Sequence, residues 1–251
     1  MTVYMIVMVK RTKGSMVDMH CHVLPAVDDG SQNMEQTIEM LRIASEEGIS
    51  AMIVTPHYKD GRHNASVQTI LSRIAQVQEE VVRQGIFVDL YPGNEIFYFH
   101  GVEDMLDKGH ILTLNNTDRV LIEFSPSSDY TYIRNALDGI RASGYVPIIA
   151  HIERYECMLR DMTRVKELKN MDIEVQVNVS SAAGKLGSRV QKYIYEMLKG
   201  RYVDYMGTDA HDTENRIPEF QECYRKLEKK FDSDYINAVF YENALAIINA
   251  K

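Results

Sequence analysis

Residues 49–57 read ISAMIVTPH, and this stretch decides which fold the sequence predicts. The apolar run 49–55 is typical of a strand that is buried on both faces, and Pro56 ends it. Before it, residues 33–47 have the spacing of an amphipathic helix and end at Gly48, a residue favoured just after a helix. His57, a candidate metal ligand that could also simply cap a turn, follows directly. A helix, a buried strand and then a reactive side chain indicate a parallel α/β protein.

The same alternation of strand and helix continues along the whole chain. The expected strands cover residues 17–23, 49–55, 86–91, 119–124, 146–150, 173–179 and 202–206. The expected helices cover residues 33–47, 66–84, 132–143, 163–170, 188–199, 218–230 and 234–249. This order predicts parallel strands with helices outside them, in a barrel or an open sheet. Because no linker-like segment divides the chain, we expect one domain over residues 16–251.

Charge and cysteine content exclude some classes of protein. The net charge of −8 argues against a nucleic-acid partner, because phosphate backbones are bound by Lys and Arg. The three cysteines, Cys21, Cys157 and Cys223, are odd in number and widely spaced, which argues against a disulfide framework. We therefore expect a cytoplasmic protein.

The first fifteen residues differ from the rest of the chain. Residues 2–9 are apolar, and three cations, Lys10, Arg11 and Lys13, follow them. A signal peptide carries its cations before a longer apolar run, and a membrane span takes about 20 residues. We expect no membrane insertion, a fold that begins at Met16, and a poorly ordered extension over residues 1–15. The alternative is an extra edge strand.

Side chains that bind metals stand at the C-terminal ends of nearly all expected strands. They are His20, His22, Asp29, His57, Glu95, Glu123, His151, Asp209 and His211. A closed barrel brings such strand ends to one mouth, whereas an open sheet spreads them along a line, so the pattern favours a barrel. One zinc ion takes three or four ligands, so this set suits a cluster of two or three ions of Mn, Fe or Zn. Each of these residues alone has an ordinary structural explanation. The prediction of a metal site depends on their occurrence together at so many strand ends.

A cysteine nucleophile is the competing chemistry. Thiol phosphatases need a cysteine, five residues and then an arginine. The sixth residue after Cys21, Cys157 and Cys223 is a valine, a threonine and a lysine, respectively. Side chains alternate along a strand, so Cys21 is expected to point away from the ligands as a buried, inert thiol.

Seven short motifs together resemble the PHP (polymerase and histidinol phosphatase) superfamily. They are DMHCH (18–22), VDDG (27–30), TPH (55–57), GNE (93–95), IEFS (122–125), AHIERY (150–155) and DAH (209–211). Within this superfamily, the VDDG and AHIERY motifs resemble the bacterial metal-dependent protein-tyrosine phosphatases of capsule and exopolysaccharide synthesis.

The resemblance implies a distorted (β/α)7 barrel with three divalent metal ions. Mn²⁺ is the expected metal, and Fe or Zn are the alternatives. The resemblance implies that His20, His22, Glu95 and Asp209 bind the first ion; Glu95, Glu123 and His151 the second; and Asp29, His57 and His211 the third. Of the two neighbouring aspartates, it favours Asp29 over Asp28. It also implies that Arg154 and Arg216 bind the substrate phosphate.

The implied reaction is hydrolysis of phosphotyrosine, with the tail of a tyrosine autokinase as substrate. The cations Lys59 and Arg62 in residues 58–63 are expected either to line the substrate approach or to belong to a solvated loop. Three alternatives remain at this point: a phosphatase for a small molecule such as histidinol phosphate, a PHP exonuclease, and a non-catalytic regulatory module. The net charge argues against the exonuclease, and the complete ligand set argues against the regulatory module.

Overall fold

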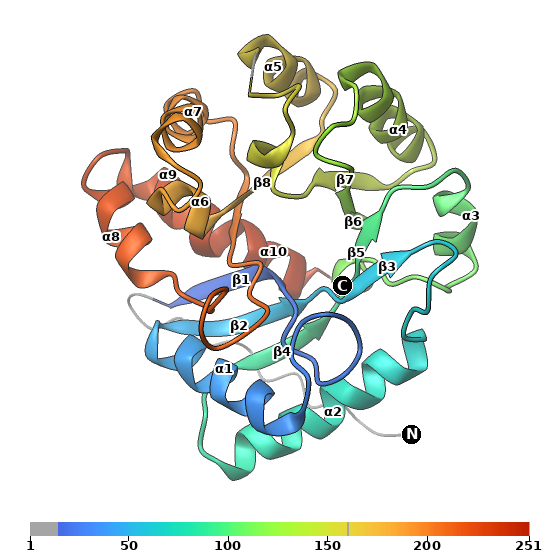
Figure 1. Cartoon of the computed structure of the whole chain (residues 1–251), viewed down its shortest axis with the longest axis vertical. Coiled ribbons are helices and arrows are strands. Elements are labelled where there is room, and N and C mark those ends of the chain that lie inside the picture. Colours follow the sequence, from blue (N-terminus) through green and yellow to red (C-terminus); the bar gives the residue numbers. More distant parts are fainter. Residues whose placement is uncertain (1–14, 160, 251) are drawn as a thin grey trace.

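The computed structural model describes residues 15–159 and 161–250. In this part of the chain, parallel strands lie at the centre and helices lie outside them (Figure 1). The predicted extension falls almost wholly on residues 1–14, which lie outside the described residues. No helix of the described residues is both long and apolar enough to cross a bilayer.

The strands form two parallel sheets. The first sheet has the order β1 (Met16–Cys21), β2 (Ile49–Val54), β4 (Asp89–Pro92). The second has the order β3 (His57–Lys59), β5 (Glu95–Phe97), β6 (Arg119–Glu123), β7 (Val146–Ile149), β8 (Glu174–Asn178), β9 (Tyr205–Gly207). The alternation of strand and helix therefore predicted the parallel α/β class correctly.

Two breaks explain why the structure has nine strands where the sequence predicts seven. β2 ends before Thr55-Pro56 and its continuation, β3, joins the second sheet, since proline has no N–H for the ladder. In the same way β4 and β5 are separated at Gly93, where a Cβ atom would lie 2.8 Å from a methyl group of Leu114. The Glu95 N–H bridges the first break, at 3.3 Å from the Thr55 carbonyl oxygen. The prediction of a loop over residues 58–63 is wrong for its first two residues, which belong to β3.

The first and last strands lie side by side at their C-terminal ends. Cys21 and Ala210 form a parallel bridge, and the His22 N–H donates to the Ala210 carbonyl oxygen at 2.8 Å. The Asp209 N–H donates to the His20 carbonyl oxygen, also at 2.8 Å. A small core cluster also contains side chains of both sheets and of the C-terminal helix, among them Val17, Ala51, Leu121, Ile148, Tyr205 and Ile247. The first strand, β1, and the last, β9, are therefore neighbours at their C-terminal ends.

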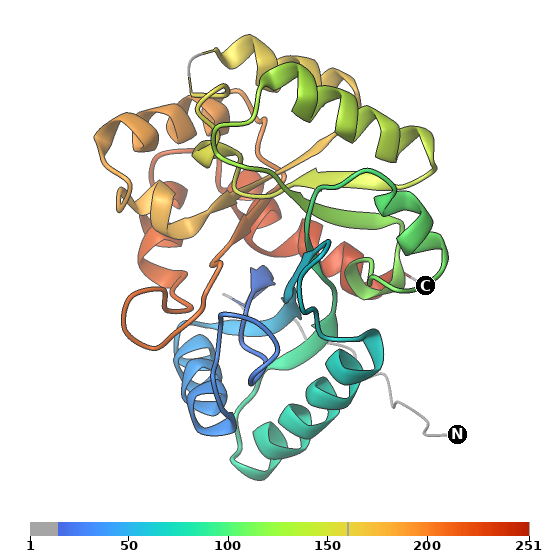
Figure 2. The same ribbon diagram turned by 45° about the vertical axis from the view of Figure 1, so that its right-hand side comes forward.

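Helices cover the outer faces of both sheets. They are α1 (Met34–Glu46), α2 (Val67–Arg83), α3 (Val102–Asp107), α4 (Tyr130–Ala142), α5 (Met162–Asn170), α6 (Val179–Ala183), α7 (Ser188–Lys199), α8 (Gln221–Glu228), α9 (Ser233–Asn237) and α10 (Asn243–Asn249). In Figures 1 and 2, α1 and α2 lie against the three-stranded sheet, and α4 and α5 lie against the six-stranded sheet.

The expected helices are confirmed to within a few residues, with three differences. The short helices α3 and α6 were not predicted, because five or six residues show no helical period. The expected helix 234–249 consists of α9, a π-helical segment (Ala238–Glu242) and α10. At α1, the Asn33 side chain accepts from the Gln36 N–H at 2.9 Å, but the Gln36 side chain accepts from the Gln32 N–H, so no capping box forms.

Candidate metal centre

The nine predicted ligands come together at the C-terminal ends of the strands. Three groups offer ligand atoms that all lie within 4.8 Å of one another: His22, Asp29, His57 and His211; His20, His22 and Glu95; His57, Glu95 and Glu123. The two remaining residues, His151 and Asp209, contact members of these groups. The structure therefore brings all nine predicted ligands close together.

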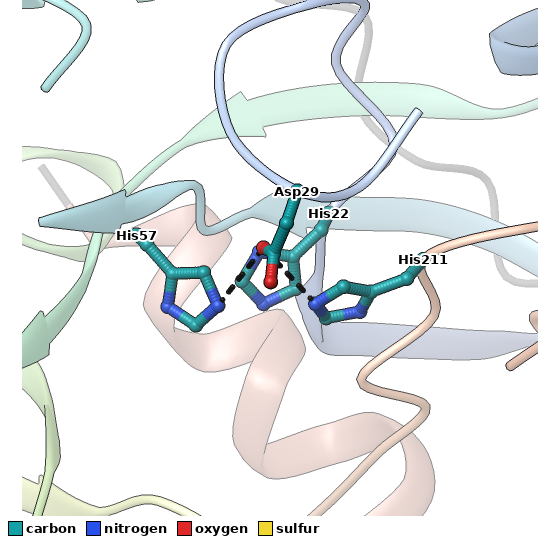
Figure 3. Close-up of side chains that lie close together, drawn as sticks. All are labelled: His22, Asp29, His57 and His211. Carbon is teal, nitrogen blue, oxygen red and sulfur yellow. Dashed lines mark ion pairs between the residues drawn. The ribbon is translucent and has the colours of Figure 1, made fainter. Parts of the chain in front are cut away.

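Asp29 lies between two histidines that come from distant parts of the chain. Figure 3 shows its carboxylate facing His57 and His211 above the ring of His22. Its Oδ1 lies 3.3 Å from His57 Nε2 and 3.6 Å from His211 Nε2. The Asp29 side chain is 69 % exposed, so it approaches the site from the solvent side.

Glu95 occupies the centre of the cluster and is 1 % exposed. Its Oε1 lies 2.8 Å from His151 Nε2 and 3.3 Å from His20 Nε2. Its Oε2 lies 2.9 Å from His57 Nδ1 and 3.4 Å from His22 Nε2. A carboxylate that faces four imidazoles through both oxygens has the geometry of a bridging ligand.

Asp209 joins the cluster to the two predicted phosphate-binding arginines. Its Oδ1 lies 3.6 Å from the Nε2 atoms of both His20 and His22. Arg154 Nη2 lies 2.8 Å from Asp209 Oδ2, and Arg216 Nη2 lies 2.5 Å from Oδ1. The two guanidinium groups are about one third exposed, so they stand beside the cluster and face solvent.

His20 and His22 aim their Nε2 atoms at the same place. The Nδ1–H of His20 donates to Gln176 Oε1 at 3.2 Å, and that of His22 donates to Asp28 Oδ2 at 2.7 Å. Both Nε2 atoms are then left for the cluster, where they lie 3.3 Å apart. Such outer partners fix the tautomer of a metal-binding histidine. Asp28 thus has a role the sequence did not assign, and Asp29 is the aspartate that reaches the cluster.

The crowding of charges shifts several pKa values. Burial by itself would lower the pKa of His22, but the carboxylates of Asp28 and Glu95 outweigh it and raise the pKa to about 10. Burial and the neighbouring His22 lower the pKa of His211 to about 3. Burial and the nearby Glu95 raise the pKa of Glu123. The pKa of Glu95 itself is well below its usual range, because the imidazoles around it outweigh its burial. These groups compete for protons, and divalent cations would take the place of those protons.

Unsatisfied polar atoms support a metal cluster. Five buried atoms of the site have no hydrogen-bond partner among the described residues: His57 Nδ1, Glu95 Oε2, Glu123 Oε2, His151 Nδ1 and His211 Nε2. The 2.9 Å contact between His57 and Glu95 is an ion-pair contact without hydrogen-bond geometry. A buried polar atom without a partner costs about 1–3 kcal/mol, which coordination to an ion would offset. The mixed nitrogen and oxygen donors therefore fit Mn, Fe or Zn.

Strand β8 carries two site residues that the sequence reasoning missed. Gln176 and Asn178 are both fully buried. Gln176 Oε1 accepts from His20 and, at 2.6 Å, from the His151 N–H, and its Nε2 donates to Asn178 Oδ1 at 2.8 Å. Asn178 Nδ2 donates to Asp209 Oδ2 at 2.8 Å. Two polar residues at i and i+2 in an apolar strand were the available signal, but Gln and Asn are not typical ligands.

Replacing Gln176 by methionine is expected to weaken metal binding about 10- to 100-fold, because His20 and His151 lose their orienting partner. Isothermal titration of the metal-free protein with Mn²⁺ measures this change. Gln191→Met is the matched control, since the Gln191 side chain on α7 bonds only the Ala182 carbonyl oxygen among the contacts described. Equal Mn²⁺ affinities for Gln176→Met and the unaltered protein would show that β8 does not support the centre.

The three cysteines take no part in the cluster. Cys21 is fully buried, its Sγ lies 3.6 Å from the Ile53 carbonyl oxygen, and burial raises the pKa of its thiol well above the usual value. Cys157 and Cys223 are also free thiols. The prediction that Cys21 is a buried thiol is confirmed.

Known proteins resemble this chain over most of its length. The model of the CpsB/CapC family, described as capsular polysaccharide synthesis, matches residues 16–249. The tyrosine-protein phosphatase YwqE of Bacillus subtilis is 31 % identical over 219 residues, which are 87 % of this chain and 86 % of YwqE. The tyrosine-protein phosphatase CpsB of Streptococcus pneumoniae is 30 % identical over 239 residues, 93 % of this chain and 98 % of CpsB.

Solved structures also resemble this chain over most of its length. A crystal structure from work on YwqE and on CpsB, described as unique metal-dependent tyrosine phosphatases, matches with a TM-score of 0.87 at 30 % identity. The match covers 93 % of this chain and 94 % of the other. Histidinol phosphate phosphatase from Lactococcus lactis shares the fold, with a TM-score of 0.57 at 12 % identity over 86 % of this chain and 93 % of the other. The expected relationship is confirmed, and the chain belongs to the CpsB/CapC family of capsular polysaccharide synthesis.

Proposed function

We propose that this protein is a metal-dependent phosphatase that hydrolyses phosphotyrosine in proteins. The observation that carries the proposal is the junction at Asp209, where two arginines meet a cluster of imidazoles and carboxylates. Forked guanidinium groups bind phosphate oxygens, and a cluster of divalent ions is a common partner for phosphoryl transfer. The relatives named tyrosine-protein phosphatases support the same activity.

We further propose three divalent ions, with Mn²⁺ preferred and Fe or Zn as alternatives. His20, His22, Glu95 and Asp209 would hold the first, Glu95, Glu123 and His151 the second, and Asp29, His57 and His211 the third. The contacts of Glu95 with both His20 and His151 support its place between the first two ions. His22 and His57 each belong to two of the three candidate ligand groups, which supports a compact arrangement of the ions.

The fold that presents these residues is, we infer, one distorted (β/α)7 barrel over residues 16–251. Seven strands result if β2 and β3 are counted as one interrupted strand, and β4 and β5 as another. The parallel bridge between Cys21 and Ala210 supports closure of the strand order. The core cluster shared by the two sheets supports it as well.

The chain's own residues would orient and hold the phosphate. When bound, the divalent ions supply positive charge to the phosphoryl oxygens and activate water for attack. Arg154 and Arg216 would bind the equatorial oxygens through paired N–H groups, where charge develops in the transition state. Asp28 and Gln176 keep His22 and His20 in the tautomers that present Nε2. Tyrosine's phenolate, with a pKa near 10, is a good leaving group that does not need a strong general acid.

The substrate, we propose, is the phosphotyrosine tail of a tyrosine autokinase that regulates capsular or exopolysaccharide synthesis in the cytoplasm. The capsule-synthesis description of the family supports this assignment. An extended peptide tail suits a site at strand ends, where Arg154, Arg216 and Asp29 are partly or largely exposed. The net charge of −8 argues against nucleic acid as the substrate.

Removal of metal tests the proposal directly. Treatment with a chelator is expected to lower activity on a phosphotyrosine peptide by roughly a thousandfold, because the ions supply several kcal/mol of transition-state stabilisation. Added Mn²⁺ is expected to restore it. Phosphate release is measured with the peptide and, in parallel, with histidinol phosphate. Full activity of metal-free protein, or a clear preference for histidinol phosphate, would contradict the proposal.

The variant Cys21→Ala distinguishes this chemistry from a thiol mechanism. It removes a thiol that is fully buried, so metal-dependent activity is expected to persist. Abolished activity at unchanged metal content would favour the thiol instead.

A further inference from the structure

Lys59 and Phe97 lie beside the candidate metal centre, one step further along β3 and β5 than His57 and Glu95. The register places His57 opposite Glu95, and two residues on it places Lys59 opposite Phe97 and Phe97 opposite Glu123. Side chains two residues apart on a strand share a face, so Lys59 and Phe97 face the same side as the predicted ligands. Two residues of a strand span roughly 6.6 Å, so the backbone of Lys59 and Phe97 lies about that far beyond His57 and Glu95, at the level of Glu123.

Phe97 does not belong to the hydrophobic core. It is partly exposed and, unlike Tyr58, Tyr98 and Phe99 around it, it is not a member of either core cluster or of the residues packed against them. A cation lies over its ring: Lys59 Nζ is 5.6 Å from the centre of the Phe97 ring and 3.9 Å from Glu123 Oε2. A cation at this distance from a ring attracts it and helps to hold its position. A partly exposed aromatic ring outside the core clusters thus lies next to the polar site.

We propose that Phe97, held by Lys59, binds the phenyl ring of the substrate's phosphotyrosine. This inference rests on the proposed function, because it assumes that the phosphate is bound by the ion ligands and the arginines. An aryl phosphate held there would extend its ring toward the strand ends, where Phe97 lies. Offset or edge-to-face contact between two rings stabilises binding beyond the area that they bury. A phosphate on an aliphatic side chain would gain nothing from Phe97, so the residue contributes to specificity for phosphotyrosine.

Calorimetry with two phosphonates tests the proposal without turnover. Phenylphosphonate and methylphosphonate share the anionic group and differ in the ring. The Mn²⁺-loaded protein is expected to bind phenylphosphonate about fivefold more tightly than methylphosphonate. Phe97→Leu is expected to remove most of this preference and to leave methylphosphonate affinity and metal content unchanged. Phe97→Tyr, which keeps the ring, is expected to retain the preference.

The controls separate this site from general effects. Phe87→Leu makes the same change at a residue that is 83 % exposed, just before β4 and therefore at the opposite ends of the strands, and should leave both affinities unchanged. Lys59→Met keeps the Phe97 ring but removes the cation that holds its position, and it is expected to reduce the preference for phenylphosphonate about twofold. This variant tests the site even if Phe97→Leu does not fold.

Two results would overturn the proposal: an unchanged preference in Phe97→Leu and Lys59→Met, or an equal loss of affinity for both phosphonates. Failure of the metal-loaded protein to hydrolyse phosphotyrosine would count against the proposed function instead, since phosphonate binding does not depend on hydrolysis.

Discussion

Replacing Glu95 by glutamine is expected to lower phosphatase activity by roughly a thousandfold and to remove bound metal at the same time. Glu95 takes part in two of the three candidate ligand groups and lies within 3.4 Å of four imidazoles. The amide keeps the size of the side chain but loses its charge, and its NH₂ group cannot bind an ion. Elemental analysis and phosphotyrosine hydrolysis, measured on the same preparation, check both parts of the prediction.

The matched control for this change is Glu222→Gln on α8. The Glu222 side chain is 82 % exposed and pairs only with Lys226 on the same helix among the contacts described. Metal content and activity are expected to stay at the level of the unaltered protein. If Glu95→Gln kept its metal and lost only activity, Glu95 would act on the substrate rather than as a bridging ligand.

Replacing Arg154 by methionine is expected to reduce kcat/KM for a phosphotyrosine peptide about hundredfold, or about 2.7 kcal/mol of transition-state stabilisation. Metal content should not change, because Asp209 keeps its contact with Arg216 at 2.5 Å and its hydrogen bond from Asn178. Arg154→Lys is expected to recover only part of the activity, since an ammonium group cannot form the two parallel bonds of a guanidinium group. Steady-state kinetics and elemental analysis measure both effects.

Arg134→Met on α4 is the control for this prediction. Arg134 resembles Arg154 in exposure, 38 % against 32 %, and in pairing with a carboxylate, here Glu167 at 2.6 Å. It lies on a helix that covers the outer face of the sheet, so its loss should leave kcat/KM unchanged. A loss of metal in Arg154→Met would show that the arginine supports Asp209 rather than the phosphate.

Local patterns predicted much of the fold because local physics controls them. The apolar run before Pro56, the spacing in residues 33–47 and the glycine at position 48 each report on hydrogen bonding and burial within a few residues. Gly48 has a φ of 82°, as a left-handed residue after a helix should. The short strands β3 and β5 were missed because three residues carry no recognisable period, and their pairing depends on strands far away in the sequence.

The sequence by itself determined which side chains have the chemistry of a metal site, because residue type and position at a strand end can be read without coordinates. Only the tertiary structure decided how they are grouped. The break at Gly93 shifts Glu95 into the second sheet, between β3 and β6, and so places its carboxylate among four histidines from three separate segments. Gln176, Asn178 and Asp28 gained their roles in the same way. Their hydrogen bonds reach partners up to 156 positions away in the chain, and no local pattern encodes such distances.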